Sequence, residues 1–391
     1  MERITFVVPS RNNLEFLKLC YAGLRNLETK HDILFLNDAS TDGTKEWLES
    51  LDDDCVRVYE NPGPERIGIV GMFDKGIEMA RTDIICAYHA DMVAGPDLDK
   101  YLLENLKPNT VVTATRVEPP LHPAGHEKII YNHGIEVDEF DMEAWLTWCS
   151  DNIDTDKTTE GIFAPWCLYN QDFVDLGGHD KLFSPQSKED SDLFNRMHLA
   201  GYKFVQTWSG LVYHFTSRGS RFNKHSGGAA GQDSKEWQHT TTVNGRNFLR
   251  KWGRFVNHDK YLKPIVSSRY NIGLCIHNCQ TDLIKNFDPM LDNIFVDCEY
   301  ASYVETENTR TPYDVGSRVS DISQEPQNDI VITIDCQKLT TRMYEILTMM
   351  SDIIDTATEP GEFKLEDIHV KINKLEKKEV QNYALSYHDA G

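Results

Sequence analysis

An apolar run ends abruptly in polar residues at Ile84-Ile85-Cys86-Ala87-Tyr88-His89-Ala90-Asp91. A buried strand has this continuous apolar pattern. A carboxylate that follows such a strand is costly unless it faces water or a cation. Because ligands of open α/β sheets lie just beyond the carboxyl ends of the strands, Asp91 is a candidate ligand for a metal or a substrate. The alternative is an ordinary turn aspartate.

Strand-like and helix-like segments alternate through the first 115 residues. The pattern predicts strands at 4–8, 32–36, 55–59, 84–88 and 110–115, and helices at 12–27, 41–51 (with Ser40 or Thr41 as N-cap) and 68–80. This alternation indicates a mostly parallel sheet with helices on both faces, whose strands end at one edge. Four of the expected strands are followed by polar residues, at Pro9-Ser10-Arg11-Asn12, Asn37-Asp38, Asn61-Pro62-Gly63 and His89-Ala90-Asp91.

The next part of the chain contains a less regular, charged stretch and then a second group of polar motifs. Residues 116–157 form the less regular stretch, which is rich in charge and proline. Glu189-Asp190 begins a predicted helix that Gly201 ends, and within it Asp192 and Arg196 can pair, since they are four residues apart. A predicted strand, 205–214, ends at His214. The Gly- and Ser-rich basic segment 216–231 is expected to be a mobile loop, either a lid over a phosphate-bearing ligand or a plain surface loop.

The composition changes beyond residue 257. We expect a large domain over residues 1–255 and a small α/β domain of unknown role over 256–391. Oligomerisation and partner binding are the two functions considered for the small domain. Strands are predicted at 270–276 and 330–334 and a helix at 343–354, whereas the polar stretch 305–328 is expected to be poorly ordered.

Charge and composition exclude several classes of protein. The net charge of -22 argues against a nucleic-acid partner. No window of 18 apolar residues and no signal peptide is present, so we expect no integral membrane segment and a cytoplasmic location. Nine scattered cysteines suit reduced thiols. The spacing Cys275-Ile276-His277-Asn278-Cys279 is only faintly like a metal site, because a second ligand pair is missing.

Residues 3–253 resemble the family 2 glycosyltransferases of GT-A fold. The ordered motifs that carry the resemblance are Val7-Val8-Pro9-Ser10-Arg11-Asn12, Asn37-Asp38-Ala39-Ser40-Thr41-Asp42-Gly43-Thr44, His89-Ala90-Asp91, Gly177-Gly178-His179-Asp180, Glu189-Asp190-Ser191-Asp192-Leu193 with Arg196 and Gly201, and His214. The resemblance implies a Rossmann-like α/β fold typical of nucleotide-diphospho-sugar transferases. Residues 1–115 would be its nucleotide-binding half, and 116–255 its acceptor half with the lid loop.

The implied activity is a hexosyltransferase-like transfer of a sugar from a UDP-, GDP- or dTDP-sugar to an acceptor hydroxyl, with inversion at the anomeric carbon. The acceptor would be a glycan, a glycolipid or a protein-linked sugar. In the family, an Asp-x-Asp element supplies a ligand for Mn²⁺ or Mg²⁺. Here His89 stands at the first position, so Asp91 is the implied metal ligand. His214 resembles the later histidine of the family and is the preferred companion of Asp91.

The resemblance also assigns the remaining roles. Asp190 matches the catalytic base, and the adjacent Glu189 could raise its pKa by like-charge repulsion. The implied nucleotide-binding residues are Pro9, Arg11, Asp38, Arg66, Ala90 and Asp91. Asp74 stands where the family usually has Asn, which leaves its role in doubt. Trp166 could stack on the acceptor or could be a core residue.

Two other functions fit parts of the sequence. A non-catalytic carbohydrate- or nucleotide-sugar-binding protein that keeps the fold is favoured by His89, which replaces an acid. A nucleotidyltransferase is less favoured, since it needs a Gly-rich phosphate loop after the first strand, where this chain has Pro9-Ser10-Arg11-Asn12-Asn13.

Overall fold

The computed structural model describes residues 2–267 and 269–378. Contacts divide the chain into two compact units, the first comprising Met1–Thr241 and His258–Ile265 and the second Thr242–Asn257 and Val266–Gly391. The division therefore falls within helix α8 (Lys235–Trp252), whereas the sequence suggested a boundary after residue 255. The last part of the expected C-terminal domain, 379–391, lies outside the described residues.

Unit 1 is built on a ten-stranded sheet. Its main strand order is β3 (Val56–Asn61), β2 (Asp32–Asp38), β1 (Ile4–Ser10), β4 (Ile84–Ala87), β9 (Trp166–Tyr169), β6 (Thr110–Glu118), β10 (Lys203–His214) and β5 (Met92–Ala94), with β7 (Lys128–Ile130) beside β6 and β8 (Thr158–Thr159) beside β10. Only β9, β5 and β8 run against the common direction. The expected mostly parallel α/β sheet is therefore confirmed.

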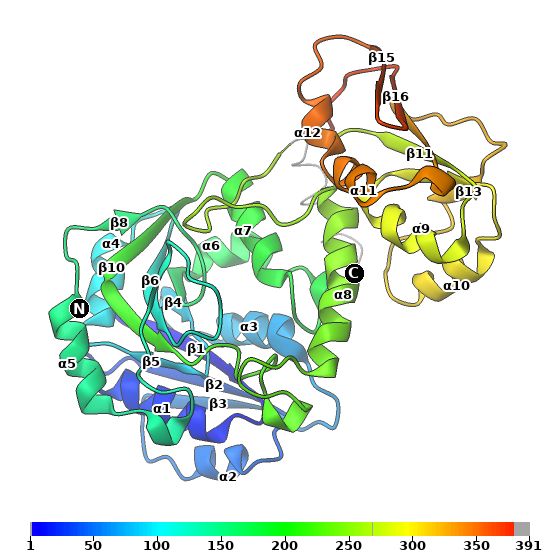
Figure 1. Ribbon diagram of the computed structural model, residues 1–391. Coiled ribbons are helices and arrows are strands. Elements are labelled where there is room, and N and C mark those ends of the chain that lie inside the picture. The colour runs from blue at the N-terminus through cyan, green and yellow to red at the C-terminus, as the bar shows by residue number, and fades with distance from the viewer. Residues whose placement is uncertain (1, 268, 379–391) are drawn as a thin grey trace. The chain divides into compact units, whose positions relative to one another are not determined.

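Helices cover both faces of this sheet (Figure 1). They are α1 (Leu14–Arg25), α2 (Thr44–Glu49), α3 (Gly68–Met79), α4 (Leu98–Asn105), α5 (Met142–Asn152), α6 (Asn170–Asp175) and α7 (Glu189–Leu199), with short 3-10 turns η1 (Val137–Glu139), η2 (Lys181–Phe183) and η3 (Lys224–Ser226). Figure 1 shows α1 and α2 on one side of β1–β3 and α3 on the other. Right-handed crossovers between parallel strands produce this arrangement.

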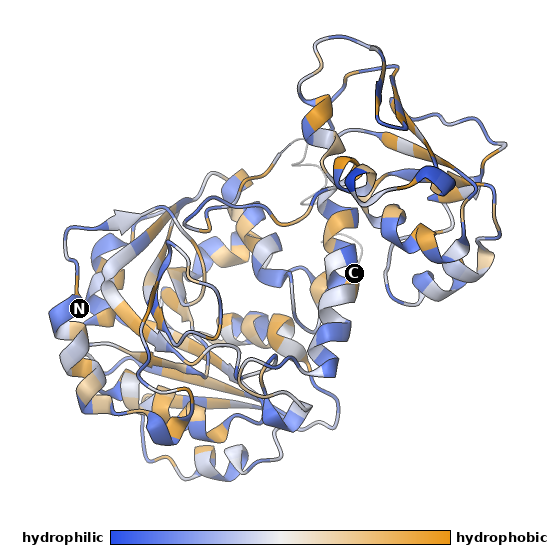
Figure 2. Ribbon diagram, viewed as in Figure 1, coloured by the Kyte–Doolittle hydropathy of each residue, from blue (hydrophilic) through white to orange (hydrophobic). Residues whose placement is uncertain are grey.

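The apolar pattern of the sequence explains these elements. Every residue of β1 is buried, and α1 buries Leu17, Cys20 and Leu24 along one face. The strands of the sheet accordingly carry mostly apolar colouring in Figure 2. Helix α2 begins later than expected, since Gly43 (φ 90°) rather than Ser40 or Thr41 precedes its first turn. The Asp42 side chain accepts the Thr44 N–H there.

Strand β9 is the main feature of the sheet that the sequence did not predict. It lies antiparallel between β4 and β6 and pairs Cys167 with Cys86. Its four residues come from a distant part of the chain, so no local sequence pattern predicts their place in the sheet. The expected neighbours 84–88 and 110–115 are thus separated by an inserted strand, although both still end at the same edge of the sheet.

Unit 2 contains a six-stranded mixed sheet. The strand order is β13 (Val319–Asp321), β12 (Asn293–Val296), β11 (Ile272–His277), β14 (Ile330–Asp335), β16 (Ile368–Ile372) and β15 (Gly361–Leu365). The helical elements are α9 (Thr281–Phe287), α10 (Ala301–Asn308), α11 (Thr341–Thr348) and α12 (Met350–Ile354), with 3-10 turns η4 (Asp288–Met290) and η5 (Cys336–Lys338). The small α/β unit and its strands near 270–276 and 330–334 agree with the sequence pattern.

Two expectations for unit 2 were wrong. The stretch 305–328 is ordered, because it contains part of α10 and all of β13 and because the Arg318 guanidinium pairs with the buried Asp288 at 2.8 Å. The predicted helix 343–354 is two helices, with Met349 (φ −100°, ψ 5°) between them. Among the described residues, no helix combines the length and the apolar character needed to cross a bilayer.

Candidate functional site

A cavity of about 340 Å³ lies at the carboxyl edge of the large sheet. Its walls come from the ends of β1, β2, β4 and β10, from the starts of α3, α7 and α8, and from the segment after β10. The residues proposed from the sequence that line it are Pro9, Arg11, Asp38, Arg66, Ala90, Asp91, Glu189, Asp190 and His214. The structure therefore brings together nearly all of the candidates.

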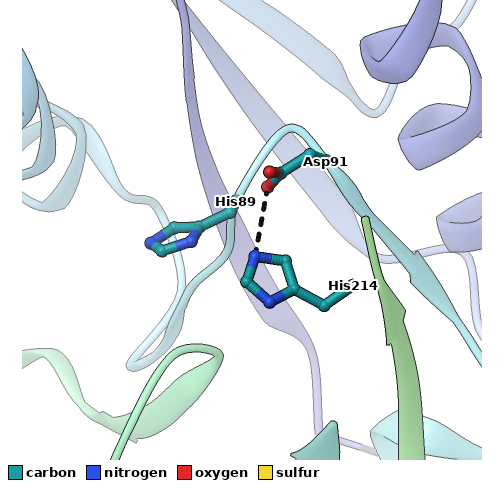
Figure 3. A group of neighbouring side chains, drawn as sticks. All are labelled: His89, Asp91 and His214. Atoms are coloured by element: carbon teal, nitrogen blue, oxygen red, sulfur yellow. Dashed lines mark ion pairs between the residues drawn. The ribbon is translucent and has the colours of Figure 1, made fainter. Parts of the chain in front are cut away.

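Three side chains of this cavity form a group that could hold a metal ion. His89, Asp91 and His214 each offer one ligand atom, and these atoms all lie within 4.8 Å of one another (Figure 3). Strand β5 pairs antiparallel with β10 and sets His214 opposite Met92, which places the imidazole beside Asp91. The structure gives Asp91 both histidines as companions, whereas the sequence favoured His214 alone. Two imidazole nitrogens and one carboxylate oxygen fit Mn²⁺ better than Mg²⁺, which prefers oxygen ligands.

Glu118, at the end of β6, orients the His214 ring. Its Oε1 atom lies 2.8 Å from Nδ1 of His214, whose Nε2 atom lies 3.6 Å from Oδ1 of Asp91. Burial alone would raise the pKa of Glu118, but the charge of Arg116 and the hydrogen bond with His214 hold that pKa below its ordinary value. The ionised Glu118 thus accepts the proton on Nδ1. In the neutral ring this leaves the lone pair of Nε2 directed toward Asp91.

His89 is prepared for the same role by its surroundings. Burial lowers the pKa of His89, against the opposing attraction of Asp91. The neutral imidazole that this favours is the form that binds metals. The ring centroids of His89 and His214 are 6.0 Å apart, and Figure 3 shows both rings near the Asp91 carboxylate, with His214 joined to it by an ion pair.

The segment after β10 is anchored in the structure, although the sequence suggested a mobile loop. The backbone N–H of Arg218 donates to Oδ2 of Asp91 at 2.7 Å. The buried Arg218 side chain donates to the carbonyl oxygens of Phe215 and Ile135, and Arg221 pairs with Asp233 at 2.5 Å. The arginines of 216–231 therefore hold the segment in place. The residues of the segment that line the cavity are small, namely Ser217, Gly219 and Ser220.

Glu189 and Asp190 begin α7 at the wall of the cavity. The Glu189 side chain is buried, and its Oε2 atom has no hydrogen-bond partner among the described residues. Burial, followed by the neighbouring Asp190, raises the pKa of Glu189 well above its ordinary value. The like-charge effect that the sequence suggested thus acts on Glu189 and favours its protonated form. Asp190 is half-buried beside it.

Helix α7 is fixed from its far side by an ion pair that the sequence predicted. Nε of Arg196 lies 2.9 Å from Oδ2 of Asp192, and both side chains are buried. The two Nη groups of Arg196 donate to the carbonyl oxygens of Leu176 and Gly178 at 2.8 and 2.6 Å. The arginine therefore joins the helix that carries Asp190 to the turn before it, so its role is structural.

Asp38 holds the end of β2 against the start of α3. Its Oδ1 atom accepts hydrogen bonds from Nδ2 of Asn61 and the N–H of Ile67, and its Oδ2 atom accepts the N–H of Gly68 at 2.8 Å. Gly68 has a φ of +87°, and a Cβ there would lie 2.4 Å from Pro185. Asp38 lines the cavity, but most of its bonding capacity is used within the protein.

Two basic residues of the cavity converge on α8. Nη2 of Arg66 lies 2.7 Å from Oε1 of Glu236, and Nη1 of Arg11 lies 3.9 Å from the same oxygen. Burial lowers the pKa of Arg66, although Glu236 opposes this shift. Trp237, the next residue of α8, also lines the cavity.

Two residues considered from the sequence lie elsewhere. Trp166 is 1% exposed and packs against Phe73 and Phe173 in the core. The suggested acceptor-stacking role is corrected to a core role, because the indole is covered on all sides. Asp74 accepts a hydrogen bond from the N–H of His179 and lies 2.7 Å from Nδ1 of the same residue, so it holds the Gly-Gly-His turn.

Sequence reasoning missed Glu118 and the α8 residues. Glu118 follows Arg116-Val117 at a strand end, the same signal that identified Asp91, but the strand was predicted to end at residue 115. Glu236 and Trp237 begin a helix far along the chain, and only the tertiary fold brings that helix to the cavity.

Comparison with known proteins finds similarity in the first part of the chain. Residues 5–147 match the family described as glycosyl transferase family 2. Among curated relatives, an undecaprenyl-phosphate mannosyltransferase of Micrococcus luteus is 28% identical over 121 residues, which cover 30% of this chain and 49% of the relative. A poly-beta-1,6-N-acetyl-D-glucosamine synthase of Staphylococcus aureus is 25% identical over 120 residues, which cover 30% of this chain and 29% of the synthase.

The matched segment thus spans at most about half the length of these relatives. Among solved structures, GalNAc-T7 with UDP, GalNAc and Mn²⁺ aligns with a TM-score of 0.47 and 13% identity, over 67% of this chain and 49% of that one.

Proposed function

We propose, on the premise that residues 5–147 belong to glycosyl transferase family 2, that the chain transfers a sugar from a nucleoside diphosphate sugar to an acceptor hydroxyl. The transfer inverts the anomeric carbon and uses a divalent cation, with Mn²⁺ favoured over Mg²⁺. The observation that carries the proposal is a single cavity lined by the His89, Asp91 and His214 group on one side and by Asp190 on another.

The donor side of the cavity suits a nucleoside diphosphate. A cation held by Asp91 and the two histidines would neutralise the charge that develops on the leaving diphosphate. Arg66 and Arg11 share Glu236 as their partner in the free protein, and a phosphate would compete with that carboxylate for them. Pro9, Ala90 and Asp38 would contact the nucleoside.

The acceptor side requires one base. An inverting displacement needs a carboxylate that removes the proton of the attacking hydroxyl. Asp190 lines the cavity and takes this role, whereas Glu189, whose raised pKa favours the protonated form, supports it without a second negative charge.

A second candidate is a nucleotide-sugar-binding protein without catalysis, favoured by His89 at the position of an acid. It shares the donor site but not the chemistry. An active transferase hydrolyses its donor slowly in the absence of acceptor, so release of nucleoside diphosphate separates the two candidates.

The test uses metal-free full-length chain and a panel of UDP-, GDP- and dTDP-sugars. We expect one donor class to raise the thermal transition in the presence of Mn²⁺, since a ligand that binds only the folded state stabilises it, and to release nucleoside diphosphate slowly. Asp91→Ala should remove this metal-dependent stabilisation. Asp83→Ala, an exposed aspartate at the other end of β4, is the matched control and should retain it.

Two outcomes contradict parts of the proposal. Stabilisation without any release of nucleoside diphosphate favours the binding protein. Stabilisation that is equal with and without metal, or equal in the Asp91→Ala variant, removes the metal role.

The nine cysteines are all free, which supports a reducing compartment such as the cytoplasm.

A further inference from the structure

Three adjacent parallel strands of the unit 2 sheet end in a polar residue followed by a cysteine. The pairs are Asn278-Cys279 at β11, Asp297-Cys298 at β12 and Asp335-Cys336 at β14. Strand β11 lies between the other two, and the register sets Ile276 opposite Val296 and His277 opposite Asp335. All three cysteines therefore leave the sheet at the same edge and at nearly the same level, where α/β sheets place reactive groups.

Hydrogen bonds between these ends hold them together. The N–H groups of Asn278 and Cys279 donate to the two carboxylate oxygens of Asp297 at 2.7 and 2.9 Å. Nδ2 of Asn278 donates to Oδ1 of Asp335 at 2.9 Å. The central loop is thus bonded to both neighbours, which fixes the starting points of the three cysteine side chains.

The thiols differ in exposure and in ionisation. Cys279 is buried, whereas Cys298 and Cys336 are partly exposed. The hydrogen bond between the thiols of Cys279 and Cys336 lowers the pKa of Cys336 despite burial and the charges of Asp297 and Asp335. The same bond, followed by burial and by the neighbouring Cys298, raises the pKa of Cys279. A partly exposed thiol with a lowered pKa, next to a protonated thiol, has the asymmetry of an attacking and a resolving cysteine.

A second cysteine pair shows that proximity alone does not give this property. Cys86 and Cys167 face each other in the register of β4 and β9, but both are fully buried. Burial raises the pKa of Cys86 well above its ordinary value, so Cys86 is held as the thiol, and neither cysteine of this pair is accessible to a reagent. It is an internal control for the strand-end cysteines.

We propose that Cys279 and Cys336 form a reactive dithiol site that low-molecular-weight disulfides oxidise to an intrachain disulfide. The Cys336 thiolate attacks one sulfur of the oxidant RSSR and breaks its S–S bond, which releases RS⁻ and leaves a mixed disulfide on Cys336. Cys279 then loses its proton and attacks the Cys336 sulfur, which releases the second RS⁻. Two protein thiols are oxidised and one RSSR is reduced to two RSH, since the two protons of the dithiol balance the two thiolates. Excess thiol reverses both steps.

The probe is oxidised glutathione added to the native full-length chain, followed by acid quenching, alkylation and mass spectrometry of peptides without reduction. We expect the chain to lose two hydrogen atoms and to yield a peptide linked through Cys279 and Cys336. In Cys279→Ser, the reaction should end with one glutathione attached to Cys336. In Cys336→Ser, the rapid reaction with oxidised glutathione should be lost. Cys298→Ser should react like the unmodified chain. Cys275→Ser, which removes a thiol whose pKa burial raises, is the matched control in β11.

A measurement without substitutions guards against misfolded variants: at neutral pH, brief iodoacetamide treatment should label Cys336 before Cys275 and should leave Cys86 and Cys167 unlabelled. The proposal is overturned if the main product links Cys279 to Cys298, if glutathione accumulates on Cys275, or if the isolated chain holds one equivalent of zinc and the dithiol is unreactive.

Discussion

Oε1 of Glu118 lies 2.8 Å from Nδ1 of His214. The contact follows from the sheet itself, because the parallel register of β6 and β10 pairs Val117 with Tyr213 and sets the next residue of each strand side by side. A carboxylate that accepts a hydrogen bond from one ring nitrogen of an imidazole fixes the tautomer. It also fixes the direction in which the other ring nitrogen points. Glu118 is therefore a positioning residue for the candidate metal group.

Glu118→Gln should weaken metal binding without removing a ligand. The amide oxygen can still accept from Nδ1, but it lacks the charge that makes the ring a stronger ligand, so we expect Mn²⁺ affinity to fall by about 10- to 100-fold. Isothermal calorimetry of the metal-free chain measures the change. Glu127→Gln is the control, since Glu127 pairs with the neighbouring Arg116 at 3.5 Å. Equal losses in both variants would assign the effect to the ion-pair network.

His89→Asp should change which metal is preferred. A second carboxylate in place of an imidazole gives the site two oxygen ligands, which suit Mg²⁺ better than the present donor set. We expect the ratio of Mg²⁺ to Mn²⁺ affinity to rise, measured by calorimetry with each ion. If the ratio is unchanged while Asp91→Ala abolishes binding of both ions, His89 does not contact the metal.

Asp190→Asn should separate chemistry from binding. Loss of the base is expected to reduce transfer, or donor hydrolysis, by about 10²- to 10⁴-fold, with donor affinity little changed. Glu189→Gln resembles the protonated form that the structure favours, so its turnover should stay close to that of the unmodified chain. Chromatographic detection of released nucleoside diphosphate gives the rates. Near-normal turnover of folded Asp190→Asn would show that another group is the base.

The raised pKa of Glu189 also makes stability depend on pH. The folded chain holds this proton more tightly than the unfolded chain, so the stabilisation is complete below the ordinary Glu pKa of about 4.3 and is lost as pH rises through the raised value. Within that window the free energy of unfolding falls by about 1.4 kcal/mol per pH unit. The Glu189→Gln variant has no such proton.

We therefore expect the thermal transition temperature of Glu189→Gln to rise relative to that of the unmodified chain as pH increases above the ordinary Glu pKa. Glu143→Gln, on the exposed face of α5, reports the effect of removing one charge from the surface. A difference between Glu189→Gln and the unmodified chain that does not vary with pH would contradict the raised pKa.

The sequence predicted those parts of the site that follow local patterns. Asp91, Asp38 and His214 each end an apolar run, and the runs became strands because burial of continuous apolar segments drives sheet formation. Asp192 and Arg196 were paired correctly, since helix periodicity alone puts them on one face.

The remaining parts depend on contacts that local patterns do not record. Trp166 sits in a short strand whose place between β4 and β6 is decided by distant partners, so nothing nearby distinguished a core indole from an exposed one. The resemblance favours His214 over His89, because the family has an acid at the position of His89, whereas the fold brings both rings close to Asp91.

Arg196→Met should destabilise unit 1, because it removes the guanidinium that pairs with the buried Asp192 carboxylate and donates to two carbonyl oxygens. Removing one member of a buried pair costs about 3–5 kcal/mol, whereas Lys75→Met breaks an exposed pair with Glu78 in α3 and should cost about 1 kcal/mol or less. Urea unfolding followed by Trp fluorescence measures both, with comparable slopes required for the comparison. Equal losses would mean that water reaches Asp192 and that the turn before α7 is held by other contacts.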